Sequence, residues 1–101
     1  MNVNTVKCRR EARLNLQGRF DFASHAQFKH ACDQALEDHD VEELVLDMTA
    51  VEYLDSSALG MLLLLRDRVA AARKAVAIEN CQGTVRQVLG IANFEKLFAI
   101  R

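Results

Sequence analysis

The chain opens with two short stretches of alternating polarity. Val3 and Val6 lie in the first stretch, and Leu14 and Leu16 alternate with polar neighbours in the second. Alternation with a period of two is typical of strands that bury one face. The pattern therefore predicts a β-hairpin whose second strand ends at Gly18, because glycine interrupts strands and favours turns.

In the next segment apolar residues recur at helical spacing. Ser24 precedes Gln27 by three residues, which is the spacing of a capping box at a helix N-terminus. The acidic and polar run from Glu37 to Asp40 ends the helix that this box would begin. Spacings of three and four residues place one set of side chains on a common, inward face. That set is Phe28, Ala31, Cys32, Ala35 and Leu36.

An unbroken apolar run, Leu44 to Leu46, follows the first helix. Runs of this kind suit a strand covered on both faces, so we expect a central strand with helices packed against it. A second helix is predicted from about Ser57 to Lys74. At 100° per residue, one face of that helix is formed by Leu62, Leu65, Val69 and Ala72.

The last part of the chain continues the alternation of strands and helices. Val76 and Ile78 indicate a fourth strand, and Thr84 begins a short helix that Gly90 is expected to end. The final apolar residues, 97–100, suit either a short strand or a helix. The whole order predicts an α/β (α+β) fold, with a mixed central sheet of about four to five strands and helices packed against it.

Size and composition narrow the function classes. A chain of 101 residues, half of them apolar and 27% charged, suits one folded domain spanning residues 1–101. The 13 basic and 14 acidic residues nearly cancel and form no basic patch, so we expect no nucleic-acid partner. The longest apolar stretch, 58–65, is far shorter than the roughly 20 residues that cross a bilayer. Without a signal segment either, we expect a cytoplasmic protein with no membrane insertion.

Reactive side chains are few and scattered. The cysteines Cys8, Cys32 and Cys81 are odd in number and widely spaced, which favours buried, reduced thiols over a disulfide or metal site. The three histidines lie on or beside the first helix without the spacing of a metal pair. No glycine-rich phosphate loop and no nucleophile elbow is present. We therefore expect no metal, no cofactor and no enzymatic activity.

The segment from Asp55 to Gly60 places an acid and two hydroxyls where a strand gives way to a helix. One interpretation is purely structural, because Asp and Ser are common N-caps. A hydroxyl there would also lie where backbone N–H groups and the helix dipole favour negative charge. Leu64 falls on the outer side of the same helix, one turn after Gly60. A single exposed leucine is common, but here it would lie close to the two serines.

Asp55-Ser56-Ser57-Ala58-Leu59-Gly60 resembles the Asp-Ser-Ser/Thr-Gly-Leu-Gly signature of the bacterial anti-sigma factor antagonists, the stand-alone STAS domains. Gly18-Arg19-Phe20-Asp21 is similar to the Gly-x-x-Asp that precedes their first helix. The order of predicted elements agrees with this family from about Val3 to Ile100. Ala58 stands where the family usually has glycine.

This resemblance implies a binding protein without catalysis of its own. The implied partners are an anti-sigma factor, often itself a serine kinase, and a serine phosphatase. Phosphorylation of the first serine of the motif, Ser56, is implied to stop binding. The candidate partner-binding residues are Asp21, Asp55, Ser57, Ala58, Leu59, Gly60 and the outward Leu64.

Two other function classes remain open. One is a constitutive STAS subunit of a lipid-transport or other membrane-associated assembly, in which phosphorylation of Ser56 would be irrelevant. The other is a nucleotide-binding sensor, which the absence of a glycine-rich loop disfavours. Capture of a kinase-like ATPase would support the antagonist, and titration with GTP or ATP would test the sensor.

Overall fold

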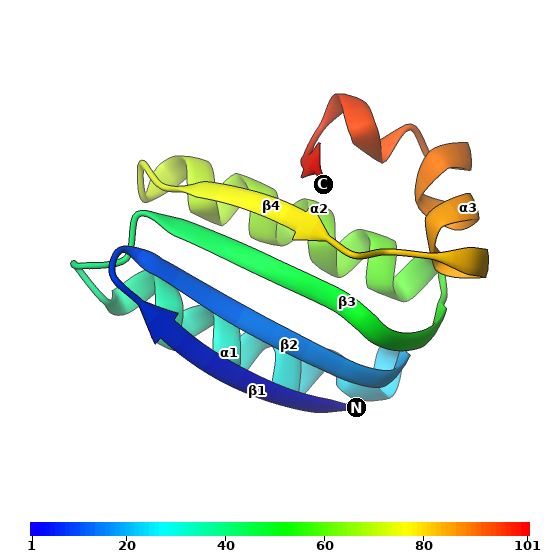
Figure 1. The fold of residues 1–101 in the computed structure, drawn as a ribbon, viewed down its shortest axis with the longest axis horizontal. Coiled ribbons are helices and arrows are strands. Elements are labelled where there is room, and N and C mark those ends of the chain that lie inside the picture. Colours follow the sequence, from blue (N-terminus) through cyan, green and yellow to red (C-terminus); the bar gives the residue numbers. More distant parts are fainter.

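The computed structural model describes residues 1–101 as a five-stranded mixed sheet with three α-helices, as the hydrophobic pattern predicts (Figure 1). The strands are β1 (Asn2–Cys8), β2 (Glu11–Phe20), β3 (Glu43–Leu54), β4 (Ala75–Glu79) and β5 (Ala99–Ile100). The helices are α1 (His25–Glu37), α2 (Ser56–Ala71) and α3 (Gly83–Ile91), with short 3₁₀ helices at η1 (Phe22–Ser24) and η2 (Phe94–Lys96).

The strands lie in the sheet in the order in which they occur along the chain. β1 pairs antiparallel with β2, and every later pair is parallel. Parallel neighbours need a crossover, and such crossovers are right-handed almost without exception. Because the sheet always grows in one direction, successive crossovers fall on the same face, and Figure 1 shows α1 and α2 side by side behind the strands. The helices therefore cover a single face of the sheet.

β3 is central and covered on both faces, as predicted, but helices supply the cover on one face only. Leu44, Val45 and Leu46 all have no exposed surface, but only the two leucines belong to the core beneath the helices. Val45 points to the opposite face, where its neighbour across β2 is Arg13. Long basic side chains cover apolar surface with their aliphatic stems. Charged side chains thus replace a second helical layer.

Those charged side chains form a connected network on the open face of the sheet, the face that no helix covers. Arg13 lies 2.9 Å from the Asp47 carboxylate and 2.7 Å from that of Glu79. Arg101 lies 3.0 Å from Glu79 and 3.2 Å from Glu43. Burial alone would raise the pKa of Asp47, but hydrogen bonds from Thr49 and, to a smaller extent, from Asn80 and Arg13 outweigh it, and the pKa is lowered. The open face is consequently polar and internally paired.

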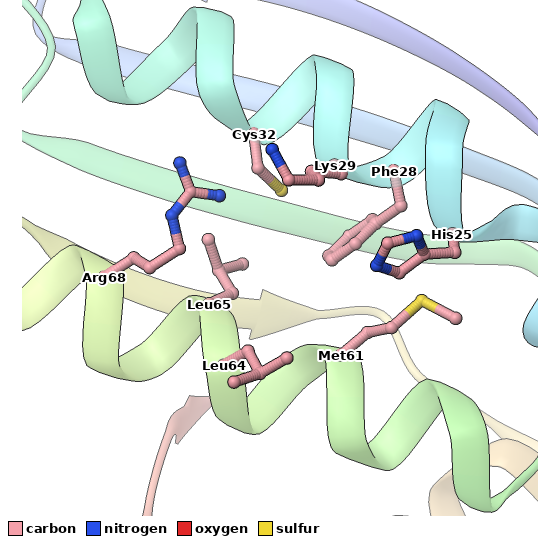
Figure 2. A pocket seen from close by; sticks show the side chains of 8 residues that line it. All are labelled: His25, Phe28, Lys29, Cys32, Met61, Leu64, Leu65 and Arg68. Carbon is pink, nitrogen blue, oxygen red and sulfur yellow. The ribbon is translucent and has the colours of Figure 1, made fainter.

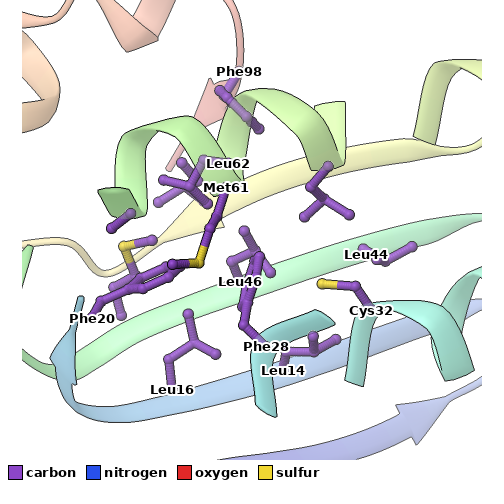
Figure 3. Packing of buried hydrophobic residues seen from close by; sticks show 14 of the residues in the cluster. Leu14, Leu16, Phe20, Phe28, Cys32, Leu44, Leu46, Met61, Leu62 and Phe98 are labelled. Atoms are coloured by element: carbon purple, nitrogen blue, oxygen red, sulfur yellow. The ribbon is translucent and has the colours of Figure 1, made fainter. Parts of the chain in front are cut away.

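The helical face holds one core cluster of 25 buried residues (Figure 3). It joins alternate residues of β2 and β3 to the inner sides of all three helices. The predicted inward residues are buried with two exceptions: Leu36 is only partly buried, and Ala72 lies beyond the end of α2 and is exposed. The confirmed ones are Phe28, Ala31, Cys32, Ala35, Leu62, Leu65 and Val69.

The start of the first helix differs from the prediction. The capping box is formed by Asp21 and Ser24 around η1, rather than by Ser24 and Gln27. The reason is the backbone: Asp21 is extended, as capping requires, whereas Ser24 already has helical angles and its side chain makes no capping hydrogen bond to α1. The Ser24 hydroxyl instead donates to the carbonyl of Arg19 at 2.8 Å. This bond fixes the loop between β2 and α1.

Helix ends and the chain terminus bring further corrections. α2 ends at Ala71 rather than near Lys74, because Arg73 adopts a left-handed conformation with φ of 59°. α3 continues past Gly90, and Asn93, at φ 59°, makes the turn instead. Of the two structures considered for residues 97–100, the strand is found, as β5, and η2 precedes this segment. Cys8 is exposed at the end of β1, contrary to the expectation of a buried thiol.

Candidate functional site

The two segments that carry the family resemblance meet at one edge of the sheet. β2 and β3 are parallel, so their carboxyl ends, at Phe20 and Leu54, lie next to each other. The backbone N–H of Asp55 donates to the carbonyl of Phe20 at 3.4 Å. The loop that contains Asp21 and the loop that begins α2 are thereby joined.

Asp55 is the N-cap of α2. Its backbone is extended, and its carboxylate accepts from the N–H of Ala58 at 3.0 Å. Its carbonyl accepts from the N–H of Leu59 at 3.2 Å. The first N–H groups of a helix have no partner within the helix, so those of Ser56 and Ser57 remain free at this end. The helix therefore presents two donors and the positive end of its dipole beside the Ser56 side chain.

The residues of the motif point in different directions. Ser56 is exposed, Ser57 is half-buried, and Ala58 has no exposed surface. This separation follows from the 100° turn between successive helical residues. Ala58, which replaces the usual glycine, consequently packs inside the core and leaves the surface around Ser56 unchanged.

Apolar surface continues from Ser56 along the outer side of α2. Gly60 is exposed, and Leu59 is half-buried. Leu64 exposes 63% of its surface and Leu63 exposes 39%. Leu64 thus faces outward, as the helical phase predicts. Solvent-exposed leucines beside an accessible hydroxyl form a surface on which a protein partner can pack.

Two exposed aromatic residues at the same sheet edge escaped the sequence analysis. Phe22 follows Asp21 and is 77% exposed, and Tyr53, the last residue but one of β3, is 38% exposed. The guanidinium of Arg19 lies 4.1 Å from the centre of the Tyr53 ring. Alternation from the inward Phe20 predicts an inward Phe22, but η1 begins at Phe22 and ends the strand periodicity, so no sequence signal gave its outward direction. Together these residues extend the apolar surface around Ser56.

None of the helices combines the length and hydrophobicity that crossing a bilayer requires. Exposed large apolar side chains also occur away from Ser56, at Val6, Ile91 and Leu97.

Comparison with known proteins identifies relatives of the whole chain. Residues 3–99 match the family model described as "Mlab, STAS domain". A STAS-domain containing protein of Pseudomonas aeruginosa (strain UCBPP-PA14) is 43% identical over 90 residues, which are 89% of this chain and 87% of the relative.

Solved structures share the fold at low identity. The anti-sigma factor antagonist SpoIIAA in its unphosphorylated form gives a TM-score of 0.76 at 18% identity, over 99% of this chain and 87% of that chain. Its phosphorylated form, from Bacillus, gives 0.74 at 17% identity, over 99% and 91%. The STAS domain of a SulP transporter from Vibrio cholerae gives 0.73 at 21% identity, over 95% and 77%. From the family match over nearly its whole length, the chain belongs to the STAS domain family.

Proposed function

We propose that this STAS domain is a cytoplasmic anti-sigma factor antagonist that acts by partner switching. In its unphosphorylated form it binds an anti-sigma factor that is also a serine kinase, and phosphorylation of Ser56 releases it. A serine phosphatase returns it to the binding form. The observation that carries the proposal is the exposed Ser56 hydroxyl at the N-terminus of α2, beside exposed apolar residues.

The surroundings of Ser56 suit a phosphate without refolding of the domain. A phosphoserine carries about −1.5 to −2 charges at neutral pH. The free N–H groups and the dipole of α2 stabilise such a charge by about 0.3–1 kcal/mol, while the neighbouring Asp55 carboxylate repels it. Because these effects are opposed and similar in size, we expect the fold to stay nearly unchanged.

The effect on binding is expected to be much larger. A phosphate at Ser56 would add bulk and charge next to the apolar surface that includes Leu64. Partner groups packed there would have to give up water to meet an ion. A loss of about 2.8 kcal/mol weakens an affinity about a hundredfold. Direct blocking of the partner is therefore sufficient to switch binding off.

Exposure supports Ser56 as the modified residue in preference to Ser57. A kinase must reach the hydroxyl, and Ser56 is exposed whereas Ser57 is half-buried in the first turn of α2. The existence of SpoIIAA in both phosphorylated and unphosphorylated forms of the same fold also supports a switch without refolding.

A second candidate is a constitutive STAS subunit of a lipid-transport or other membrane-associated assembly. The match to the Mlab STAS model and the shared fold with a SulP transporter domain favour it. In that function the same surface of α2 would bind a partner permanently. Phosphorylation of Ser56 would then have no regulatory role.

Affinity capture with three forms of the protein tests the proposal. Wild type and Ser56→Ala should retain the same anti-sigma factor, and Ser56→Asp should lose it. Incubation with the captured kinase and ATP should add one phosphate, which mass spectrometry should place on Ser56 in wild type and in a Ser57→Ala control. Equal capture of a membrane-associated partner by all three forms would instead establish the second candidate.

A further inference from the structure

A groove of about 140 Å³ lies between α1 and α2, on the side of the helices that faces away from the sheet (Figure 2). Phe28 and Cys32 of α1 and Met61 and Leu65 of α2 supply its inner apolar surface, and Leu64 lies at its rim. Burial raises the pKa of the Cys32 thiol to about 12, so this group is neutral and unreactive at physiological pH. The floor of the groove is accordingly uncharged.

The size of the groove suits one bulky apolar side chain. A cavity of about 150 Å³ lined by apolar residues holds a benzene molecule. A leucine or phenylalanine side chain is of comparable size, and it would also cover part of Leu64, which is 63% exposed. A groove of this volume does not require a large ligand to fill it.

The rim of the groove carries an excess of positive charge. Lys29 and Arg68 face each other across it, and both pair with the same carboxylate, that of Asp33. A hydrogen bond from Lys29, followed by one from Arg68, lowers the pKa of Asp33, which keeps it ionised. His25 lies at the end of the groove nearest the start of α1, and no carboxylate lines the groove itself. Two cations that share one anion leave a net charge that an acidic ligand complements.

The groove is continuous with the surface that contains Ser56. Leu64 follows Ser56 by eight residues, which corresponds to about 12 Å along the helix axis. Gly60 lies between them and is exposed. A ligand in the shape of a helix, with apolar residues at intervals of three and four, could fill the groove and cover Leu64 at the same time.

We propose that the groove between α1 and α2 binds an acidic amphipathic helix through one leucine- or phenylalanine-sized anchor. The anchor contacts Phe28, Met61 and Leu65, and its acidic neighbours pair with Lys29 and Arg68. That this helix belongs to the protein whose binding Ser56 controls rests on the proposed function. The proposal that the groove binds an acidic helix is independent of the proposed function.

A synthetic peptide tests the groove directly. The probe is a helix of about 20 residues, long enough to be helical in isolation, with leucines at three- and four-residue intervals flanked by glutamates. It is titrated into protein labelled at the methyl groups of leucine and methionine. We expect NMR shifts centred on Met61, Leu64 and Leu65. Shifts centred elsewhere, or none, would overturn the proposal.

Changes in the peptide separate the anchor from the charges. Replacing its leucines by alanine should abolish the shifts, and replacing its glutamates by lysine should weaken binding several-fold at low salt, with a smaller difference at high salt. Equal binding of the lysine peptide would contradict the acidic ligand. Phenylacetate, which carries a ring and a carboxylate without a helix, should bind far more weakly. If phenylacetate bound with the same affinity as the peptide, the ligand of the groove would be a small molecule and not a helix.

Matched protein variants locate the contact. Leu64→Ala should weaken peptide binding about tenfold, as loss of a central interface contact does. Leu97→Ala, at an exposed leucine that follows η2, should not weaken it. The double variant Lys29→Glu, Arg68→Glu should bind the glutamate peptide more weakly, and Lys96→Glu serves as its exposed charge control. Thermal unfolding confirms that each variant is folded. Losses of the same size in the controls would overturn the assignment.

The Ser56→Asp variant distinguishes this inference from the proposed function. At 0.15 M salt, charges more than about 8 Å apart are largely screened, so this variant should bind the peptide normally. If the peptide binds the groove but Ser56→Asp still captures the partner, the switch fails and the groove stands. If Ser56→Asp loses the partner and the peptide does not bind wild type, only the proposal about the groove is contradicted.

Discussion

The two sides of α2 have similar hydrophobicity and opposite surroundings. Four consecutive leucines, 62–65, pass through both sides. On the inner side, Leu62 and Leu65 are at most 2% exposed, whereas on the outer side Leu63 and Leu64 are 39% and 63% exposed. The position of each leucine around the helix, and not its apolar character, decides whether it stabilises the domain or remains available for a partner. Stability and binding should therefore respond to different substitutions in the same helix.

The largest effect on stability is expected on the inner side. Leu62→Ala should lower the free energy of unfolding by about 2–5 kcal/mol, because it removes a fully buried side chain and leaves a cavity. Urea unfolding measures this loss. A decrease below about 1 kcal/mol, as for a surface position, would show that this side of α2 is not core.

On the outer side, the largest expected effect is on binding alone. Ser56→Asp should weaken the complex with the anti-sigma factor about a hundredfold while leaving the unfolding free energy nearly unchanged. Titration calorimetry with the captured partner measures the affinity, with Ser56→Ala as the control.

Phosphorylated wild-type protein tests whether blocking is direct. Amide NMR shifts caused by phosphorylation of Ser56 should be confined to the start of α2 and the adjoining loop before α1. Shifts spread across the central strands would contradict direct blocking and would indicate a conformational mechanism.

A smaller effect on stability is expected at Asp55, the N-cap of α2. Asp55→Ala should lower the unfolding free energy by about 1 kcal/mol, because the N–H of Ala58 loses its acceptor. Asp55→Asn preserves an acceptor and should remain close to wild type. Thermal unfolding compares the three proteins, and an equal loss in both variants would assign the effect to the charge rather than the cap.

The smallest effect on stability is expected at Leu64. Leu64→Ala should change the unfolding free energy by no more than about 0.5 kcal/mol, as at other surface positions, since the side chain is mostly exposed. The same substitution should measurably weaken partner binding. A stability loss as large as that of Leu62→Ala would remove the distinction between the two sides of the helix.

Local periodicity predicted most of this fold because burial on one face leaves a repeating signal. The alternation around Leu14 and the three-to-four spacing after Phe28 identified their elements correctly. The run at Val45 correctly indicated burial on both faces, but it did not show that Arg13 lies beside Val45, because only the pairing of β2 with β3 places it there. A charged residue that shields a strand has no periodic signature.

The part of the candidate site formed by one contiguous segment could be predicted from the sequence. The motif from Asp55 to Gly60 indicated the helix start, its cap and the outward serine. Phe22 and Tyr53 were missed, since isolated exposed aromatics resemble core residues until the direction of the side chain is known. The groove was also out of reach, because Lys29 and Arg68 meet only when α1 packs beside α2.

The sequential order of the strands has a consequence for how this chain is made. Each strand pairs with the one that precedes it in the sequence, so no pairing has to wait for a distant segment. Closing a loop costs more entropy the longer the loop is, so pairing each strand with its predecessor costs less than pairing strands further apart in the sequence would. A growing chain can complete β1, β2, α1 and β3 before β4 has left the ribosome, and each new strand then adds to an edge that already exists.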